Sequence, residues 1–133
     1  MPTVIYPKFK EQALQGGVNL ASGNIKAVLV DLADYTYSAA HEFLSDVPAA
    51  ARVATTGNLA SKTFTNGTFD SADPSFTAVT GDVSEALILF IDTGTAGTSR
   101  LIAFYDTGVG GLPFTPNGGD INVTVNASGW FAL

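Results

Sequence analysis

The sequence predicts a mainly β fold, either a β-sandwich or a jelly-roll-like arrangement of about eight short strands, with one or two short helices near the N-terminus. The segments 85–91, after its first residue Glu85, and 101–105 are continuously apolar, as in strands that are covered on both faces. Ile121, Val123 and Val125 alternate with polar residues, which is typical of a half-exposed strand. Turn-forming Gly, Asn, Asp and Pro recur at short spacing between such runs.

The first expected element is a helix over residues 6–15. Its apolar side would hold Phe9, Ala13 and Leu14, while lysine, glutamate and glutamine fall on the other side. Gly16-Gly17 is a strong stop signal, because glycine readily adopts the left-handed conformation that ends helices.

A strand and a second helix are expected next. The β-rich apolar run 25–30 predicts a strand that ends at Asp31. Residues 38–44 are expected to form the second helix, because Ser38 is a favourable N-cap and Pro48 lies beyond the end.

From residue 52 onward nearly every segment indicates strand. Asn66-Gly67 is a two-residue hairpin signal, and the residues from Phe76 to Ala78 alternate with period two. The apolar segment 130–133 is expected to complete a sheet. The predicted core contains eleven residues from these runs: Val28, Val30, Phe64, Phe76, Leu87, Leu89, Ile102, Phe104, Ile121, Val123 and Phe131.

Composition indicates one domain and an uncharged surface. The 133 residues are expected to form a single β domain, with residues 1–17 as an N-terminal arm or helix. The absence of Cys excludes disulfides, and neither a leader peptide nor a membrane-spanning run is apparent. The net charge of −6 argues against nucleic-acid binding. Only 14% of residues are charged, which favours assembly with partners because little charge must be desolvated.

Two Asp-Thr-Gly triplets, at residues 92–94 and 106–108, each follow an apolar strand. Aspartic proteases use this triplet to bring two carboxylates together around one shared proton. Here the intervening loop is of hairpin size, so Asp92 and Asp106 should lie near opposite ends of one hairpin, ~17–20 Å apart. The triplets are better explained as turns, in which Asp caps the turn and Gly takes a positive φ.

Other reactive residues do not form a recognisable catalytic pattern. His41, the sole histidine, has Glu42 and Asp46 nearby, but no Ser stands at a recognisable spacing for a catalytic triad. The glycine-rich residues 108–111 lack the Lys-Ser/Thr of a phosphate-binding loop. We therefore expect no enzymatic activity, catalytic residue, cofactor or bound metal, and we assign turn capping to the scattered acids Asp70, Asp73 and Asp82.

Several segments, taken together, resemble small structural proteins of tailed bacteriophages. The resemblance covers nearly the whole chain, and its most specific part is Pro116-Asn117-Gly118-Gly119-Asp120. The matching segments are residues 6–8, 25–31, 40–47, 99–103 and 112–120.

This resemblance implies a virion protein, and among small ones a capsid decoration (cement) protein. Such a protein would bind the major capsid protein on the outside of the shell as a homo-oligomer, a trimer, after synthesis in the cytoplasm of the bacterial host. The alternative is a receptor- or carbohydrate-binding module of a tail fibre or baseplate, in which Tyr35, Tyr37 and Phe114 would stack on sugars.

The N-terminal segment 2–10 is the candidate arm for reaching the capsid. Tyr6 and Phe9 would be its apolar anchors, and Lys8 and Lys10 would bring positive charge to an acidic chain. The alternative is that this segment covers one end of the sandwich.

Overall fold

A central five-stranded sheet forms the body of the protein. The computed structural model describes residues 4–107 and 109–133, and within them the chain is mainly β, as predicted. The strand order is β1-β7-β6-β2-β3, and every neighbouring pair is antiparallel. The five strands are β1 (Val4–Ile5), β2 (Asn24–Val30), β3 (Arg52–Thr55), β6 (Ala86–Asp92) and β7 (Leu101–Tyr105).

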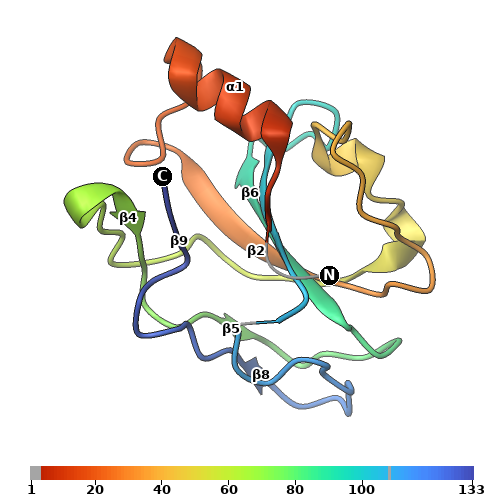
Figure 1. The fold of residues 1–133 in the computed structure, drawn as a ribbon. Coiled ribbons are helices and arrows are strands. Elements are labelled where there is room, and N and C mark those ends of the chain that lie inside the picture. Colours follow the sequence, from red (N-terminus) through yellow and green to blue (C-terminus); the bar gives the residue numbers. More distant parts are fainter. Residues whose placement is uncertain (1–3, 108) are drawn as a thin grey trace.

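Two short antiparallel sheets and their loops make a second, smaller layer, so the fold is sandwich-like with unequal layers (Figure 1). Tyr105 of the central sheet packs edge-on against Trp130, with ring centroids 5.4 Å apart. Its hydroxyl also donates to the Trp130 carbonyl oxygen at 2.8 Å. The small sheets pair β4 (Thr68–Phe69) with β9 (Phe131–Ala132), and β5 (Ser75–Phe76) with β8 (Ile121–Asn122).

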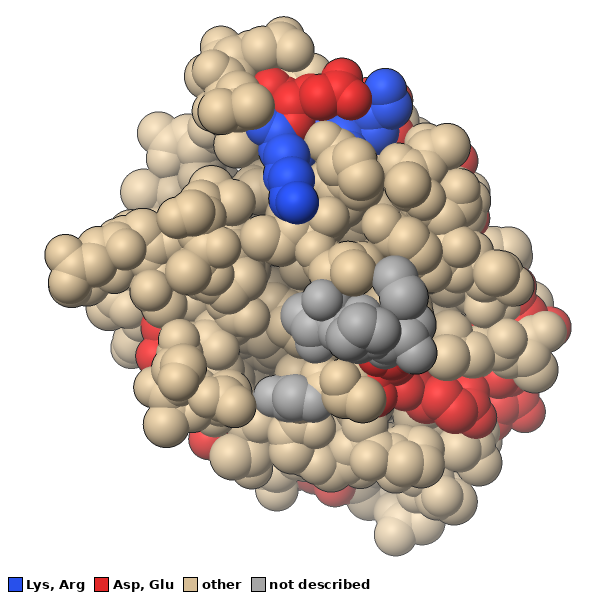
Figure 2. Space-filling model, in the orientation of Figure 1, with Lys and Arg blue, Asp and Glu red and all other residues tan. Residues whose placement is uncertain are grey.

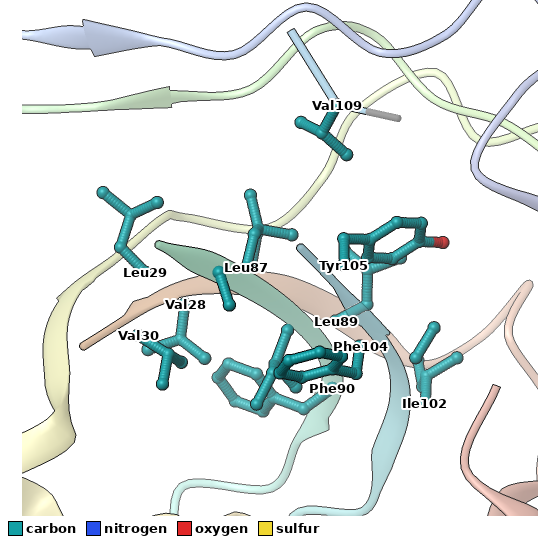
Figure 3. Close-up of a cluster of buried hydrophobic side chains, with 14 of the residues drawn as sticks. Val28, Leu29, Val30, Leu87, Leu89, Phe90, Ile102, Phe104, Tyr105 and Val109 are labelled. Atoms are coloured by element: carbon teal, nitrogen blue, oxygen red, sulfur yellow. The ribbon is translucent and has the colours of Figure 1, made fainter. Parts of the chain in front are cut away.

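The central strands β6 and β7 are covered on both faces, as their continuous apolar runs predict. All of β7 and the first five residues of β6 are buried. Figure 3 shows Leu87 and Tyr105 on the side of Val109, whereas Phe104 points to the other side. There Phe104 contacts the ring of Tyr37, with centroids 5.4 Å apart. Burial on both sides explains why these strands lack polar alternation.

The predicted core is largely confirmed. Phe64 and Phe131 are the two exceptions: Phe64 is 41% exposed, and Phe131 is only partly buried. Both lie in or beside the small β4–β9 sheet at the rim of the molecule, where a large apolar residue has neighbours on one side only. The buried members are Val28, Val30, Phe76, Leu87, Leu89, Ile102, Phe104, Ile121 and Val123.

Helix α1 (Pro7–Gln15) lies across one end of the sandwich (Figure 1). It ends as predicted, because Gly16 adopts a left-handed conformation with φ 74° and its N–H donates to the Ala13 carbonyl oxygen. Phe9 is 1% exposed, but Leu14 is 90% exposed, so its expected place on the apolar side is wrong. Leu14 is five positions after Phe9, which places it about 140° around the helix from Phe9.

The second predicted helix, over residues 38–44, does not form. Ser38 does accept a hydrogen bond from the Ala40 N–H, but the chain then extends, and Phe43 pairs with Arg100 as an isolated antiparallel bridge. Two short 3₁₀ turns follow, at Leu44–Asp46 and Ala49–Ala51. Long-range pairing with the segment that leads into β7 thus overrides the local helix signal.

Asn66 and Gly67 lie in a turn and both have positive φ (54° and 79°), but the predicted two-residue hairpin does not form. The turn is a short 3₁₀ segment, Thr65–Gly67, within a longer loop. Thr63 and Asp70 exchange two backbone hydrogen bonds across it. The strand that leaves the turn, β4, pairs with the C-terminal β9, so this turn brings the end of the chain next to residues 64–69.

Candidate functional site

The first Asp-Thr-Gly triplet forms a hairpin turn. The Asp92 carboxylate accepts a hydrogen bond from the Gly94 N–H at 3.0 Å, and Gly94 has φ 88°. Lys26 on β2 lies 2.7 Å from the other Asp92 oxygen. The Lys26 ammonium, together with the Gly94 N–H, holds the pKa of Asp92 below its usual range. A carboxylate fixed in its ionised form by these partners caps a turn, as the sequence predicts.

The two triplets lie at opposite ends of the β6–β7 hairpin. The strand register pairs Leu87 with Tyr105, so Asp106 follows at the Leu87 end, whereas Asp92 pairs with Asn24 at the far end. Gly108 of the second triplet lies outside the described residues. This geometry cannot bring the two carboxylates together around one proton, so no protease dyad forms from them.

Replacing Asp92 by Asn should remove the ion pair with Lys26 and keep the turn. We expect a loss of about 0.2–1 kcal/mol in the free energy of unfolding at pH 7. Because the pKa of Asp92 is lowered by folding, its contribution is present above the ordinary aspartate pKa and disappears as the pH falls through the lower folded value. Urea denaturation at pH 7 and at about pH 2 measures this. Acid-dependent proteolysis that the change abolishes would contradict the turn interpretation.

His41 belongs to a hydrogen-bonded chain that reaches into the core. Its Nδ1 lies 2.8 Å from the Tyr35 hydroxyl, which lies 2.8 Å from the Tyr6 hydroxyl. Burial raises the pKa of Tyr35 to about 12 and raises that of Tyr6 further. The predicted neighbours of His41 serve the local fold. Glu42 forms an ion pair with Arg100 at 2.9 Å, and Asp46 accepts hydrogen bonds from the N–H groups of residues 42 and 43.

Of the three scattered acids, Asp70 caps its own turn as expected, whereas Asp73 hydrogen-bonds to a segment far along the chain. Asp70 accepts from the Ser71 N–H at 2.8 Å, and Asp73 accepts from the Val125 N–H at 3.1 Å. Asp82 instead lies beside two other acids, because carboxylate oxygens of Asp31, Asp34 and Asp82 come within 4.8 Å of one another. One Asp31 oxygen accepts from the Ala33 N–H, so part of this group also serves a turn.

The expected capsid-binding arm is built into the fold. Val4–Ile5 forms β1, the edge strand that pairs with β7, and the Tyr6 N–H donates to the Ile102 carbonyl oxygen at 3.0 Å. Tyr6 is fully buried and Phe9 nearly so, which removes both as exposed anchors. The segment therefore covers the end of the sandwich, the alternative that the sequence left open. Residues 2 and 3 lie outside the described residues.

The two basic residues predicted for this contact remain on the surface. Lys8 pairs with Glu11 one turn along the helix, at 3.1 Å. Lys10 is exposed, and it lines a hollow beside α1. Of the predicted set Tyr6, Lys8, Phe9 and Lys10, only these two lysines are therefore accessible to a partner.

An apolar groove runs along both sides of α1, and we name it the α1 groove. It consists of two hollows that share Ala13 and Leu133. One, of about 360 Å³, lies between α1, residues 18–21 and the β4–β9 sheet. The other, of about 390 Å³, lies between β1, α1 and β9, with Lys10 at its rim. Leu14 and Leu133 stand out beside them, 90% and 69% exposed.

The floor and walls of the α1 groove are firmly held. Phe64, Phe69, Phe131 and Phe9 form a continuous row, with successive ring centroids 5.6, 5.5 and 6.3 Å apart. The wall at residues 18–23 is held by Lys62, whose ammonium donates to the carbonyl oxygens of Leu20, Ala21 and Gly23 at 2.8, 3.2 and 2.7 Å. An apolar surface held in this way suits a protein contact better than a mobile loop does.

The sequence contains a helical spacing that predicts which residues of this site are buried, but the arm prediction did not use it. Tyr6, Phe9 and Ala13 are spaced three and four residues apart, which places them on one helix face and predicts their burial. Leu14 falls outside that spacing, so it is the residue to expect at the surface. Leu133 and Phe64 carry no comparable signal, because their exposure follows from the long-range pairing of β4 with β9.

Comparison of the chain with protein-family models finds no match, and comparison with curated proteins finds none either. Within residues 4–107 and 109–133 no helix combines the length and the apolar character needed to cross a membrane. What the α1 groove binds is therefore inferred from its shape, its charge and the resemblance to bacteriophage proteins.

Proposed function

We propose that the protein is a non-enzymatic structural component of a tailed-bacteriophage virion, a capsid decoration protein. It binds the major capsid protein on the outer surface of the shell, as a homotrimer, and stabilises the shell. The observation that carries this proposal is the α1 groove, an exposed apolar surface that favours a homo-oligomer, on a small and weakly charged domain that suits assembly onto a shell. The sequence resemblance supplies the virion context.

The surface chemistry favours permanent assembly over catalysis. A monomeric protein rarely leaves residues such as Leu14 and Leu133 exposed side by side, because contiguous apolar surface promotes association. Figure 2 shows that the face containing α1 is largely neutral, with few charged side chains to desolvate. The side chains of Asp92, His41 and Asp46, which the sequence offered as catalytic candidates, cap turns or form hydrogen bonds within the fold.

The alternative function, a tail-fibre or baseplate module that binds a carbohydrate, has less support. Sugar binding needs exposed aromatic faces, but Tyr35 and Phe114 are buried. Tyr37 is partly exposed, and its ring packs against Tyr6 with centroids 5.2 Å apart. The three aromatic residues expected to stack on sugars therefore do not form an open platform.

The position of the protein in the intact particle tests this proposal. An affinity tag after Leu133 risks blocking the α1 groove, so a gold-labelled antibody raised against the folded domain is the better probe. We expect electron microscopy to show label distributed over the whole capsid shell. Label confined to the tail would support the alternative module. A third outcome would overturn both virion assignments. In that outcome, a phage that carries the gene yields particles without label, and the antibody detects the protein only in the unassembled fraction.

A further inference from the structure

We infer that the α1 groove receives the acidic end of a second copy of this chain, so that copies associate head to tail. The acidic end is defined by Val83 together with Asp31, Asp34 and Asp82. This inference deepens the proposed function, because it names the two surfaces that build the homo-oligomer. Its test needs no capsid, so it can fail while attachment to the shell holds.

The α1 groove combines an apolar surface with one positively charged side chain at its edge. Its second hollow is lined by Ile5, Ala13, Leu14 and Leu133, and its one charged lining residue is Lys10. Lys8, on the opposite side of α1, is already paired with Glu11. Lys10 makes no ion pair with any residue in the ranges 4–107 and 109–133. A partner that fills this hollow should therefore bring an apolar side chain next to a carboxylate.

The acidic end offers that combination. Val83 is the one large apolar side chain far from the groove that is substantially exposed among the described residues, at 39%. It follows Asp82, whose carboxylate lies within 4.8 Å of those of Asp34 and Asp31. Asp34 and Asp82 are exposed. Figure 2 shows blue side chains, with red ones beside them, near the end where Figure 1 places α1, and a larger group of red side chains at the lower right, away from α1.

Charge complementarity favours a second copy as the occupant. Each chain carries a net charge of −6, so two copies repel each other unless a basic area meets an acidic one. The contact of Lys10 with the carboxylates at the other end reverses that repulsion locally. Because the two surfaces differ, the contact is heterologous, and it closes into a ring when the rotation between copies allows. A ring of three would give the trimer of the proposed function.

Charge reversal at both ends tests the contact. The wild-type protein should form a discrete oligomer in light-scattering chromatography and sedimentation, weaker at high salt. Lys10→Glu and Asp82→Lys should each weaken association by about tenfold, and the double variant should recover most of the loss. Lys8→Glu, which changes the net charge equally on the far side of α1, is the matched control. Leu14→Asp, at an exposed position, should abolish association without unfolding the domain.

Three results would overturn the inference. The first is a wild-type protein that remains monomeric at high concentration and low salt. The second is a double variant whose association does not recover, because Lys10 and Asp82 would then not contact each other across the interface. The third is a Lys10→Glu variant that stays oligomeric but no longer binds bare capsids, because the shell would then be the occupant of the α1 groove.

Discussion

Replacing Phe9 by Ala should lower the free energy of unfolding by about 3–5 kcal/mol, whereas Leu14→Ala in the same helix should change it by less than about 0.5 kcal/mol. Phe9 is nearly inaccessible and packs edge-on against Phe131, so truncation leaves a cavity between α1 and the β4–β9 sheet. Leu14 points into solvent, and its loss removes almost no buried area. Of these two apolar residues of one helix, Phe9 stabilises the fold, whereas Leu14 is exposed and belongs to the proposed contact surface.

Urea denaturation followed by the fluorescence of Trp130 measures both effects. This is the one tryptophan of the chain, and it is buried against Tyr105, so its emission reports the core. Association of the folded variants should show the reverse order, with Leu14→Ala weakened. If the two changes destabilised the protein equally, that result would contradict a structure in which Phe9 is buried and Leu14 is exposed. A Phe9→Ala protein of full stability would restore Phe9 as a surface anchor.

Alkaline pH should unfold the protein by a cooperative step driven by its buried tyrosines. Burial raises the pKa of Tyr35 to about 12 and raises those of Tyr6 and Tyr105 beyond that. A tyrosine in the unfolded chain ionises near pH 10. The stabilisation is therefore complete below about pH 10 and is lost as the pH rises through the folded pKa values, because the unfolded chain releases its protons first.

Phenolate absorbance and far-ultraviolet circular dichroism, followed together against pH, check this prediction. Most phenolate should appear only with the loss of β structure. Tyr6→Phe is the control: it removes one buried hydroxyl and its contact with Tyr35, so it should cost about 0.5–1.5 kcal/mol at pH 7 and make the alkaline transition less steep. Ionisation of all the tyrosines near pH 10 in a chain that stays folded would refute their burial.

The fold could be predicted where local sequence and tertiary environment agree. The runs 86–91 and 101–105 are apolar throughout because both faces of the strands are covered, and α1 ends where Gly16 takes a left-handed conformation. Residues 38–44 show the opposite case. A helix signal there loses to the pairing of Phe43 with Arg100, which no local pattern reveals because its partner is far along the chain.

The candidate binding surface was harder to predict than the fold. The sequence indicates a weakly charged protein suited to assembly and directs attention to the N-terminal segment, and the α1 groove does lie there. It also assigns the contact to Tyr6 and Phe9, which the structure buries. The error arises because two apolar residues in a terminal segment look like anchors until β1 is known to pair with β7. Leu133 joins the groove only through the β4–β9 pairing.

The sheet order also sets when this protein can fold. β1 pairs with β7, joining Ile5 to Ala103, and β2 pairs with β6, joining Val28 to Ile88. β1 therefore waits without a partner strand until β7 has been made, and β2 has only β3 beside it until β6 has been made. Closing such distant contacts is slow, because loop entropy is lost before any pairing energy is gained. This interval exposes the apolar strands of the nascent chain to aggregation, and a chaperone that binds them would protect the chain until their partners emerge.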